Sequence, residues 1–211
     1  MKITRENGLN VSIQAIYFDL GGVLVRTEDR APRSQLAARL GITSEALEEL
    51  VFGGASGRKG QLGEISAAQQ WAYVCQQINW PLANWRDLEG DFFSGDRLDI
   101  ELVDYIRRLQ GRYKTGVISN ALSDVRVAMD NKWHMADAFD AITISAEVGV
   151  MKPDARIFQI ALQSLDVQPA EAVFVDDFSH NVEGARAVGM HAIQFRSPEQ
   201  VRQDLEAVLY L

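Results

Sequence analysis

The feature that most constrains the fold is a predicted strand, Ala15–Asp19, that ends on a carboxylate and is followed by Gly21 and Gly22. A short apolar run of this kind is typical of a buried strand. A charge at its end is costly unless it is paired or used. In open α/β sheets ligands bind at the carboxyl ends of the strands, and glycines let the main chain turn there. The stretch therefore predicts a reactive Asp19.

The second half of the chain alternates between strand and helix patterns. This alternation predicts an α/β fold with a doubly wound, Rossmann-like parallel sheet. The predicted strands are Tyr113–Ile118, Ala141–Ser145, Ala172–Val175 and His191–Phe195. The predicted helices follow Asp99, with Ile100, Val103, Ile106 and Leu109 inward, and then span Leu122–Lys132, Ala155–Leu165, Val182–Val188 and Pro198–Leu209.

Between Glu28 and Asp96 the sequence shows helical patterns and no strand pattern. It predicts a small all-helical cap domain at residues 27–98, inserted in a catalytic core of residues 1–26 and 99–211. The tryptophans and phenylalanines of the insert are interpreted as its core. Five glycines, with Arg58 and Lys59, predict a flexible basic loop over Gly53–Gly63. This loop is either a solvated linker or a segment that reaches over the active site.

The charge balance limits the possible partners. The net charge is −8 in 211 residues, and an acidic surface repels nucleic acid. No apolar run approaches the roughly 18 residues of a membrane span, and the polar stretch Met1–Gln14 does not resemble a signal peptide. With a single cysteine, Cys75, the expectation is a cytoplasmic protein that binds neither nucleic acid nor membrane. Its oligomeric state is not indicated.

Side chains that can carry chemistry follow the predicted strands, and parallel strands bring these ends to one edge of the sheet. Three carboxylates at one edge repel each other and need a cation, a shared proton, or both. The sequence has no Cys/His zinc spacing, so a set of hard oxygen ligands favours Mg²⁺. The residues concerned are Asp19, Ser119, Asn120, Lys152, Asp176 and Asp177.

This set fits an attack on a phosphoryl group, and a cap of this size suggests a small phosphorylated metabolite because it would close over the site. Asp19 is suited to be the nucleophile, giving an aspartyl-phosphate that water then hydrolyses. Mg²⁺ and Lys152 would neutralise the phosphate, and Ser119 would donate a hydrogen bond to it. We therefore expect a hydrolase that acts on phosphate esters.

Five stretches resemble the haloacid dehalogenase (HAD) superfamily, in the order of that family's motifs. The resemblance implies a helical cap after the first motif. It also implies Asp19 as nucleophile and metal ligand, the Gly21 carbonyl as a ligand, Ser119 and Asn120 as a phosphate-positioning pair, and Lys152 as the charge-stabilising lysine. Asp177 would be the direct metal ligand, and Asp176 would orient a metal-bound water or hold Lys152. The stretches are Phe18–Leu24, Val117–Asn120, Met151–Phe158, Phe174–Asp177 and Asn181–Met190.

The chain departs from this pattern at Gly21, where phosphatases of the family usually carry a second aspartate as general acid and base. Members with a non-acidic residue there are similar to sugar-phosphate phosphatases. One interpretation is a phosphatase in which Glu28 or a cap residue substitutes, or whose leaving group needs little protonation. The alternatives are a catalytically impaired binding or regulatory protein and a haloacid dehalogenase. The Asp176–Asp177 pair argues against a dehalogenase, which needs no metal.

Overall fold

The structure is a computed structural model that describes residues 12–209. The outer ends of the predicted core, residues 1–11 and 210–211, lie outside the described residues, as does most of the stretch on which the signal-peptide prediction rests. Within the described part of the chain, no helix has the length and apolar character needed to cross a membrane.

Five parallel strands form the predicted sheet, in the order β5-β4-β1-β6-β7. The first strand, β1, lies at the centre and is buried along its length. This arrangement confirms the predicted doubly wound α/β sheet. The strands are β1 (Ala15–Phe18), β4 (Lys114–Ser119), β5 (Ala141–Ile144), β6 (Ala172–Asp176) and β7 (His191–Gln194).

Helices cover both faces of this sheet. Because side chains alternate along a strand, Ile16 and Phe18 of β1 pack under α6, α7 and α11, while Tyr17 packs under α9 and α10. The helices of the core are α6 (Ile100–Leu109), α7 (Val125–Asn131), α8 (Ser145–Val148), α9 (Ala155–Ser164), α10 (Ser179–Ala187) and α11 (Pro198–Leu209), with short 3₁₀ turns η2 (Ala136–Ala138) and η3 (Pro169–Glu171).

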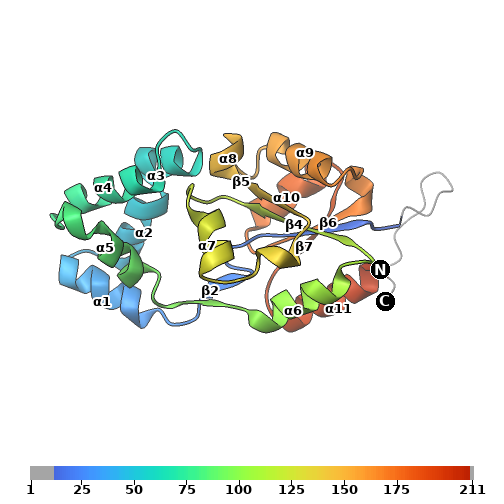
Figure 1. Ribbon diagram of the computed structural model, residues 1–211, viewed down its shortest axis with the longest axis horizontal. Coiled ribbons are helices and arrows are strands. Elements are labelled where there is room, and N and C mark those ends of the chain that lie inside the picture. Colours follow the sequence, from blue (N-terminus) through green and yellow to red (C-terminus); the bar gives the residue numbers. More distant parts are fainter. Residues whose placement is uncertain (1–11, 210–211) are drawn as a thin grey trace.

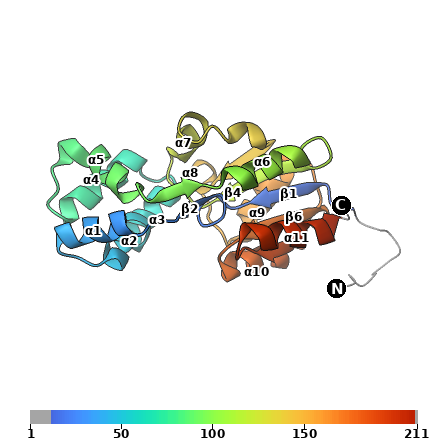
Figure 2. The same cartoon turned by 90° about the horizontal axis from the view of Figure 1, so that it is seen from below.

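The inserted helices form a body of their own beside the core (Figures 1 and 2). Trp71 and Phe92 are fully buried in its apolar cluster, against which Trp80, Trp85 and Phe93 pack. The aromatic residues are thus the core of the insert, as predicted. Its helices are α1 (Ala31–Leu40), α2 (Ser44–Phe52), α3 (Gly54–Gln61), α4 (Ala67–Gln77), η1 (Leu82–Asn84) and α5 (Trp85–Phe92).

The two linkers of this cap pair with each other. Strands β2 (Val25–Thr27) and β3 (Asp96–Leu98) form an antiparallel ribbon, which the Thr27 hydroxyl strengthens by donating to Asp96 at 2.6 Å. The predicted domain boundaries at residues 26/27 and 98/99 fall within or at the end of this ribbon. The sequence pattern indicated linkers here but not their pairing.

Two local predictions were wrong. The stretch Gly53–Gly63 contains helix α3 in place of a flexible loop, because its glycines serve close packing: a Cβ on Gly57 would lie 2.5 Å from the Phe52 main chain. Ile100, expected to point inward, is 64% exposed. It precedes Leu102 by just over half a helical turn, and so points away from the buried stripe.

Candidate active site

Asp19 lies at the carboxyl end of the central strand. Its main-chain N–H donates to the Val175 carbonyl at 2.8 Å, which continues the β1–β6 ladder by one residue. This register places Asp19 beside Asp176. The Asp19 side chain is 9% exposed, and its Oδ1 accepts from the Leu20 N–H at 2.7 Å. The strand pairing therefore fixes both the depth and the direction of this carboxylate.

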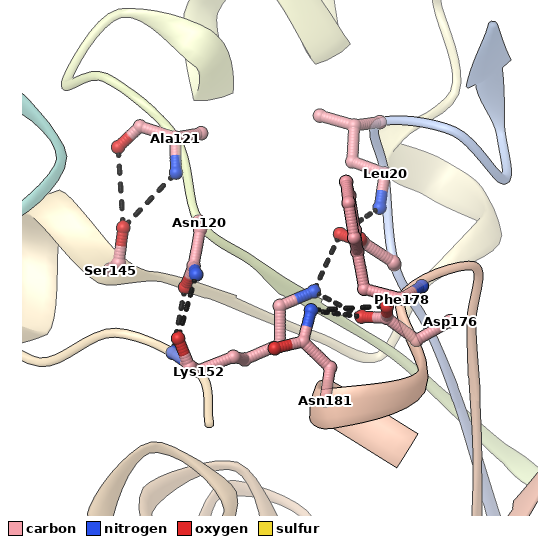
Figure 3. A network of polar contacts seen from close by, with 9 residues as sticks. Leu20, Asn120, Ala121, Ser145, Lys152, Asp176, Phe178 and Asn181 are labelled. Carbon is pink, nitrogen blue, oxygen red and sulfur yellow. Dashed lines mark hydrogen bonds and ion pairs between the residues drawn. The ribbon is translucent and has the colours of Figure 1, made fainter. Parts of the chain in front are cut away.

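Lys152 bridges the two neighbouring carboxylates. Its Nζ lies 2.8 Å from Asp19 Oδ1 and 2.6 Å from Asp176 Oδ2, and its side chain is 1% exposed. The main chain of Lys152 is held on both sides by the Asn120 amide: the Lys152 N–H donates to Oδ1 at 2.8 Å, and Nδ2 donates to the Lys152 carbonyl at 3.0 Å (Figure 3). The lysine thus enters the site in a fixed position.

The two predicted phosphate-positioning residues are placed differently. Ser119 ends β4 and is 3% exposed. The Asn120 side chain, in contrast, uses both its oxygen and its nitrogen on Lys152. Its side chain is therefore positioned to hold the lysine, a role that the sequence did not indicate.

The adjacent aspartates at the end of β6 have different surroundings. Asp176 is fully buried and accepts hydrogen bonds from Lys152, from the Phe178 N–H at 2.8 Å, and from Asn181 Nδ2, which lies 3.1 Å from each carboxylate oxygen. Asp177 Oδ1 is buried and has no hydrogen-bond partner among the described residues. A buried polar oxygen is expected to bind a hydrogen-bond donor or an ion, so the Asp177 carboxylate has an oxygen available to coordinate a metal.

Asn181 is a residue of the site that was not predicted from the sequence. In the sequence it stands within the stretch Asn181–Met190 that resembles the family, with no role indicated for its side chain. Helix α10 begins shortly after β6, and its first turn brings the Asn181 amide back onto Asp176. A buried amide one turn into the helix that follows a strand-end carboxylate is the signal that could have identified it.

The electrostatics of the cluster call for a cation. One oxygen from each of Asp19, Asp176 and Asp177 lies within 4.8 Å of the others. Burial raises the pKa of Asp19 to about 7, although Lys152 opposes the shift, and the charges of the other two aspartates add to it. Burial and the charge of Asp176 also raise the pKa of Asp177. Three carboxylates facing one lysine, with one oxygen unpartnered, suit a hard divalent ion such as Mg²⁺.

The two glycines after Asp19 have separate roles. Gly22 has a φ of +79°, and a Cβ there would lie 2.3 Å from Asp177 Oδ2, so only glycine lets the loop pass this carboxylate. Gly21 is exposed, and a Cβ there would meet nothing within 4 Å. Glu28, considered as a substitute acid, is exposed and pairs with Arg26 at 3.3 Å. The structure thus does not bring Glu28 into the carboxylate cluster.

Comparison with known families agrees with this geometry. A family model described as haloacid dehalogenase-like hydrolase matches residues 13–189. The chain belongs to the haloacid dehalogenase-like hydrolase family. The match covers the sheet strands up to β6, the inserted cap and all the strand-end residues described above.

The curated proteins to which this chain is similar differ in length. Mouse acyl-CoA dehydrogenase family member 10 is 26% identical over 222 residues, which cover 94% of this chain and 19% of that protein. The chain therefore spans about a fifth of that relative. D-ribitol-5-phosphate phosphatase from Bacteroides thetaiotaomicron is 27% identical over 218 residues, which cover 93% of this chain and 98% of that protein.

A solved structure shares the fold. It is the wild-type HAD family enzyme from Bacteroides thetaiotaomicron in complex with magnesium and inorganic phosphate, with a TM-score of 0.74 and 20% sequence identity. The superposition covers 88% of this chain and 95% of that one. This haloacid dehalogenase-like chain therefore has the same architecture as an enzyme crystallised with both ions.

Proposed function

We propose that this haloacid dehalogenase-like hydrolase is a Mg²⁺-dependent phosphatase that acts on a small phosphorylated metabolite, with Asp19 as the nucleophile. The observation that carries the proposal is the Asp19 carboxylate held 2.8 Å from the Lys152 ammonium beside the unpartnered oxygen of Asp177. A D-ribitol-5-phosphate phosphatase similar over nearly its whole length supports the reaction class.

The metal would be held by the Asp19 and Asp177 carboxylates and the Gly21 carbonyl. When bound, Mg²⁺ supplies positive charge that neutralises the phosphate and lowers the cost of bringing two anions together. Asp176 would act mainly through Lys152, since its oxygens are already engaged by Lys152, Asn181 and the Phe178 N–H.

In the first step a free Asp19 oxygen attacks phosphorus, and the ester P–O bond breaks as the new P–O bond forms. The departing oxygen carries the electron pair and takes a proton from solvent where its basicity requires one. In the second step water attacks phosphorus and gives up a proton to solvent, the bond to Asp19 breaks and restores its carboxylate, and inorganic phosphate leaves. Lys152 neutralises charge on the phosphoryl oxygens and Ser119 donates a hydrogen bond to one of them, while Asn120 keeps Lys152 in place.

Because Gly21 provides no acid, the leaving oxygen must depart with little help. General acid–base catalysis is typically worth about 10²–10⁴-fold. We therefore propose that the preferred substrates have good leaving groups: anomeric sugar phosphates, acyl phosphates or aryl phosphates. The alternative is a binding or regulatory protein with little turnover, favoured by the open space at Gly21 and the exposed position of Glu28.

The decisive experiment measures phosphate release from p-nitrophenyl phosphate, acetyl phosphate and an anomeric sugar phosphate, with Mg²⁺ and with excess chelator. Asp19→Asn should reduce release to background, whereas Asp130→Asn, at an exposed position on α7, should leave it unchanged. Mass spectrometry of acid-quenched protein should find one phosphate on the peptide that contains Asp19. Full activity in Asp19→Asn would exclude the mechanism. No turnover of any ester, together with thermal stabilisation by one of them, would favour the binding protein.

A further inference from the structure

The last turn of α3 and the residues after it lie against the core at two places, the loop that follows β4 and helix α8, which directly follows β5. Close approach depends on glycine: a Cβ on Gly60 would lie 2.7 Å from Leu122 Cδ2, and one on Gly63 would lie 2.0 Å from the Ala146 carbonyl oxygen. The Ala67 N–H, at the start of α4, donates to the Ser123 hydroxyl at 3.2 Å. The cap is thus docked on the core at a place separate from the β2–β3 ribbon.

One buried hydroxyl joins the two sides of this contact. Ser145, the first residue of α8, is fully buried. Its Oγ accepts from the Ala121 N–H at 3.0 Å and donates to the Gln61 carbonyl of α3 at 2.6 Å. The Ala121 carbonyl lies farther away, at 3.4 Å. Since a hydroxyl has one proton, the shorter distance assigns it to Gln61.

The core side of this bridge leads directly to the reactive residues. Ala121 follows Ser119 and Asn120 in the chain, and the Asn120 amide holds the main chain of Lys152 from both sides (Figure 3). Lys152 in turn contacts Asp19. Apart from this chain connection, each link is a hydrogen bond or ion pair of normal length. A displacement of α3 would therefore remove a partner from the loop that places Ser119 and Asn120.

We propose that Ser145 is a positioning residue that couples docking of the cap to the placement of Ser119 and Lys152. Its catalytic consequence rests on the proposed phosphatase function, whereas the coupling itself does not. If α3 lifts away, the Ser145 hydroxyl loses its acceptor and the Ala121 N–H is no longer held by a fixed partner. The loss of a hydrogen-bond partner is unfavourable for the fully buried Ser145 hydroxyl and for the partly buried Ala121 N–H, so the docked cap and the ordered loop stabilise each other.

The test compares Ser145→Ala with a matched control, Ser164→Ala. Ser164 also donates its hydroxyl to a main-chain carbonyl, that of Ala161 at 2.7 Å, but on α9. Hydrogen–deuterium exchange is followed in peptides covering residues 59–66 and 119–124, together with kcat and KM for p-nitrophenyl phosphate. Ser145→Ala should speed exchange at least tenfold in both segments and less than threefold elsewhere. It should also lower kcat at least tenfold, with KM changed less than threefold. Ser164→Ala should leave the exchange rates, kcat and KM within twofold of the wild-type values.

A second variant tests the coupling from the cap side. Gly63→Ala introduces a Cβ against the Ala146 carbonyl and should undock α3 without altering any residue of the core. It should speed exchange in residues 119–124, and combining it with Ser145→Ala should add little to either single change. Unchanged exchange in these residues in Gly63→Ala, fully additive effects, or a uniform rise along the chain would each overturn the proposal. If the wild-type protein lacks phosphatase activity, the proposed function fails while the exchange measurements still decide the coupling.

Discussion

Replacing Gly21 with aspartate tests whether the missing acid limits the reaction. Gly21 is exposed, and a Cβ at this position meets no heavy atom within 4 Å. Gly21 is also not among the glycines with a positive φ, so Gly21→Asp should be accepted without strain. The new carboxyl would stand two residues after Asp19, at the position where phosphatases of the family usually carry their acid.

The magnitude follows from what a general acid contributes. Activity of Gly21→Asp on an alkyl phosphate such as glycerol phosphate should rise by up to about 10²–10⁴-fold. Activity on p-nitrophenyl phosphate should change by less than about tenfold, because that leaving group departs without a proton. The loss of glycine's freedom in the unfolded chain favours the variant by about 0.4–1 kcal/mol. Repulsion between this added carboxylate and the three aspartates of the site opposes this, so the free energy of unfolding without Mg²⁺ should change little.

The assay measures kcat/KM for both esters at saturating Mg²⁺, with Gly90→Asp as the control. Gly90 lies on α5 of the cap and is exposed, and a Cβ added there would likewise meet no heavy atom within 4 Å. This control variant therefore adds the same charge away from the site. Equal gains on both esters, or an equal gain in Gly90→Asp, would refute the view that leaving-group protonation is what Gly21 lacks.

Three further predictions concern the charges of the site. Lys152→Met should lower the free energy of unfolding by about 3–5 kcal/mol at pH 8, because Asp19 and Asp176 then face each other without their cation. In urea titrations without Mg²⁺ this loss of unfolding free energy should be smaller at pH 5. The pKa of Asp19 is raised to about 7, so Asp19 is protonated at pH 5 and no longer repels Asp176. An equal loss at both pH values would contradict this explanation. Gly22→Ala should weaken Mg²⁺ binding, measured by calorimetry, at least tenfold, because the new Cβ would collide with the Asp177 carboxylate. The control Gly149→Ala also replaces a glycine of positive φ, +69°, but in open space, and should leave Mg²⁺ binding unchanged. Excess EDTA should abolish phosphate release and added MgCl₂ should restore it, and release that persists in EDTA would rule out the metal.

The sheet and the convergence of the strand ends could be predicted because both follow from local patterns and a topological rule. Apolar runs identify buried strands, and parallel strands bring their carboxyl ends to one edge. Asp19 and Lys152, far apart in the chain, were placed together in this way. The division of work between Asp176 and Asp177 could not be derived from spacing alone, because it depends on which oxygen meets Asn181 and which one remains unpartnered.

Helix α3 and the ribbon β2–β3 were missed for different reasons. Glycine has low intrinsic helix propensity, so Gly53–Gly63 favoured a loop. The stretch forms helix α3 because Gly57 and Gly60 let the helix pack closely against its neighbours, which are Phe52, Gln70 and Leu122. The ribbon has only three residues on each strand, and its partners are far apart in the chain, so no local pattern indicates their pairing.

The ribbon also bears on how such a chain can change over evolutionary time. The cap leaves and re-enters the core through hydrogen-bonded neighbours, since Thr27 pairs with Asp96 and Val25 with Leu98. Antiparallel neighbours can be joined by a turn of two residues as readily as by a whole bundle of helices. Helices can therefore be lengthened, shortened or exchanged between these two points while the sheet keeps its register. The carboxylate cluster of the core and the helices of the cap thus lie on segments that are free to diverge independently.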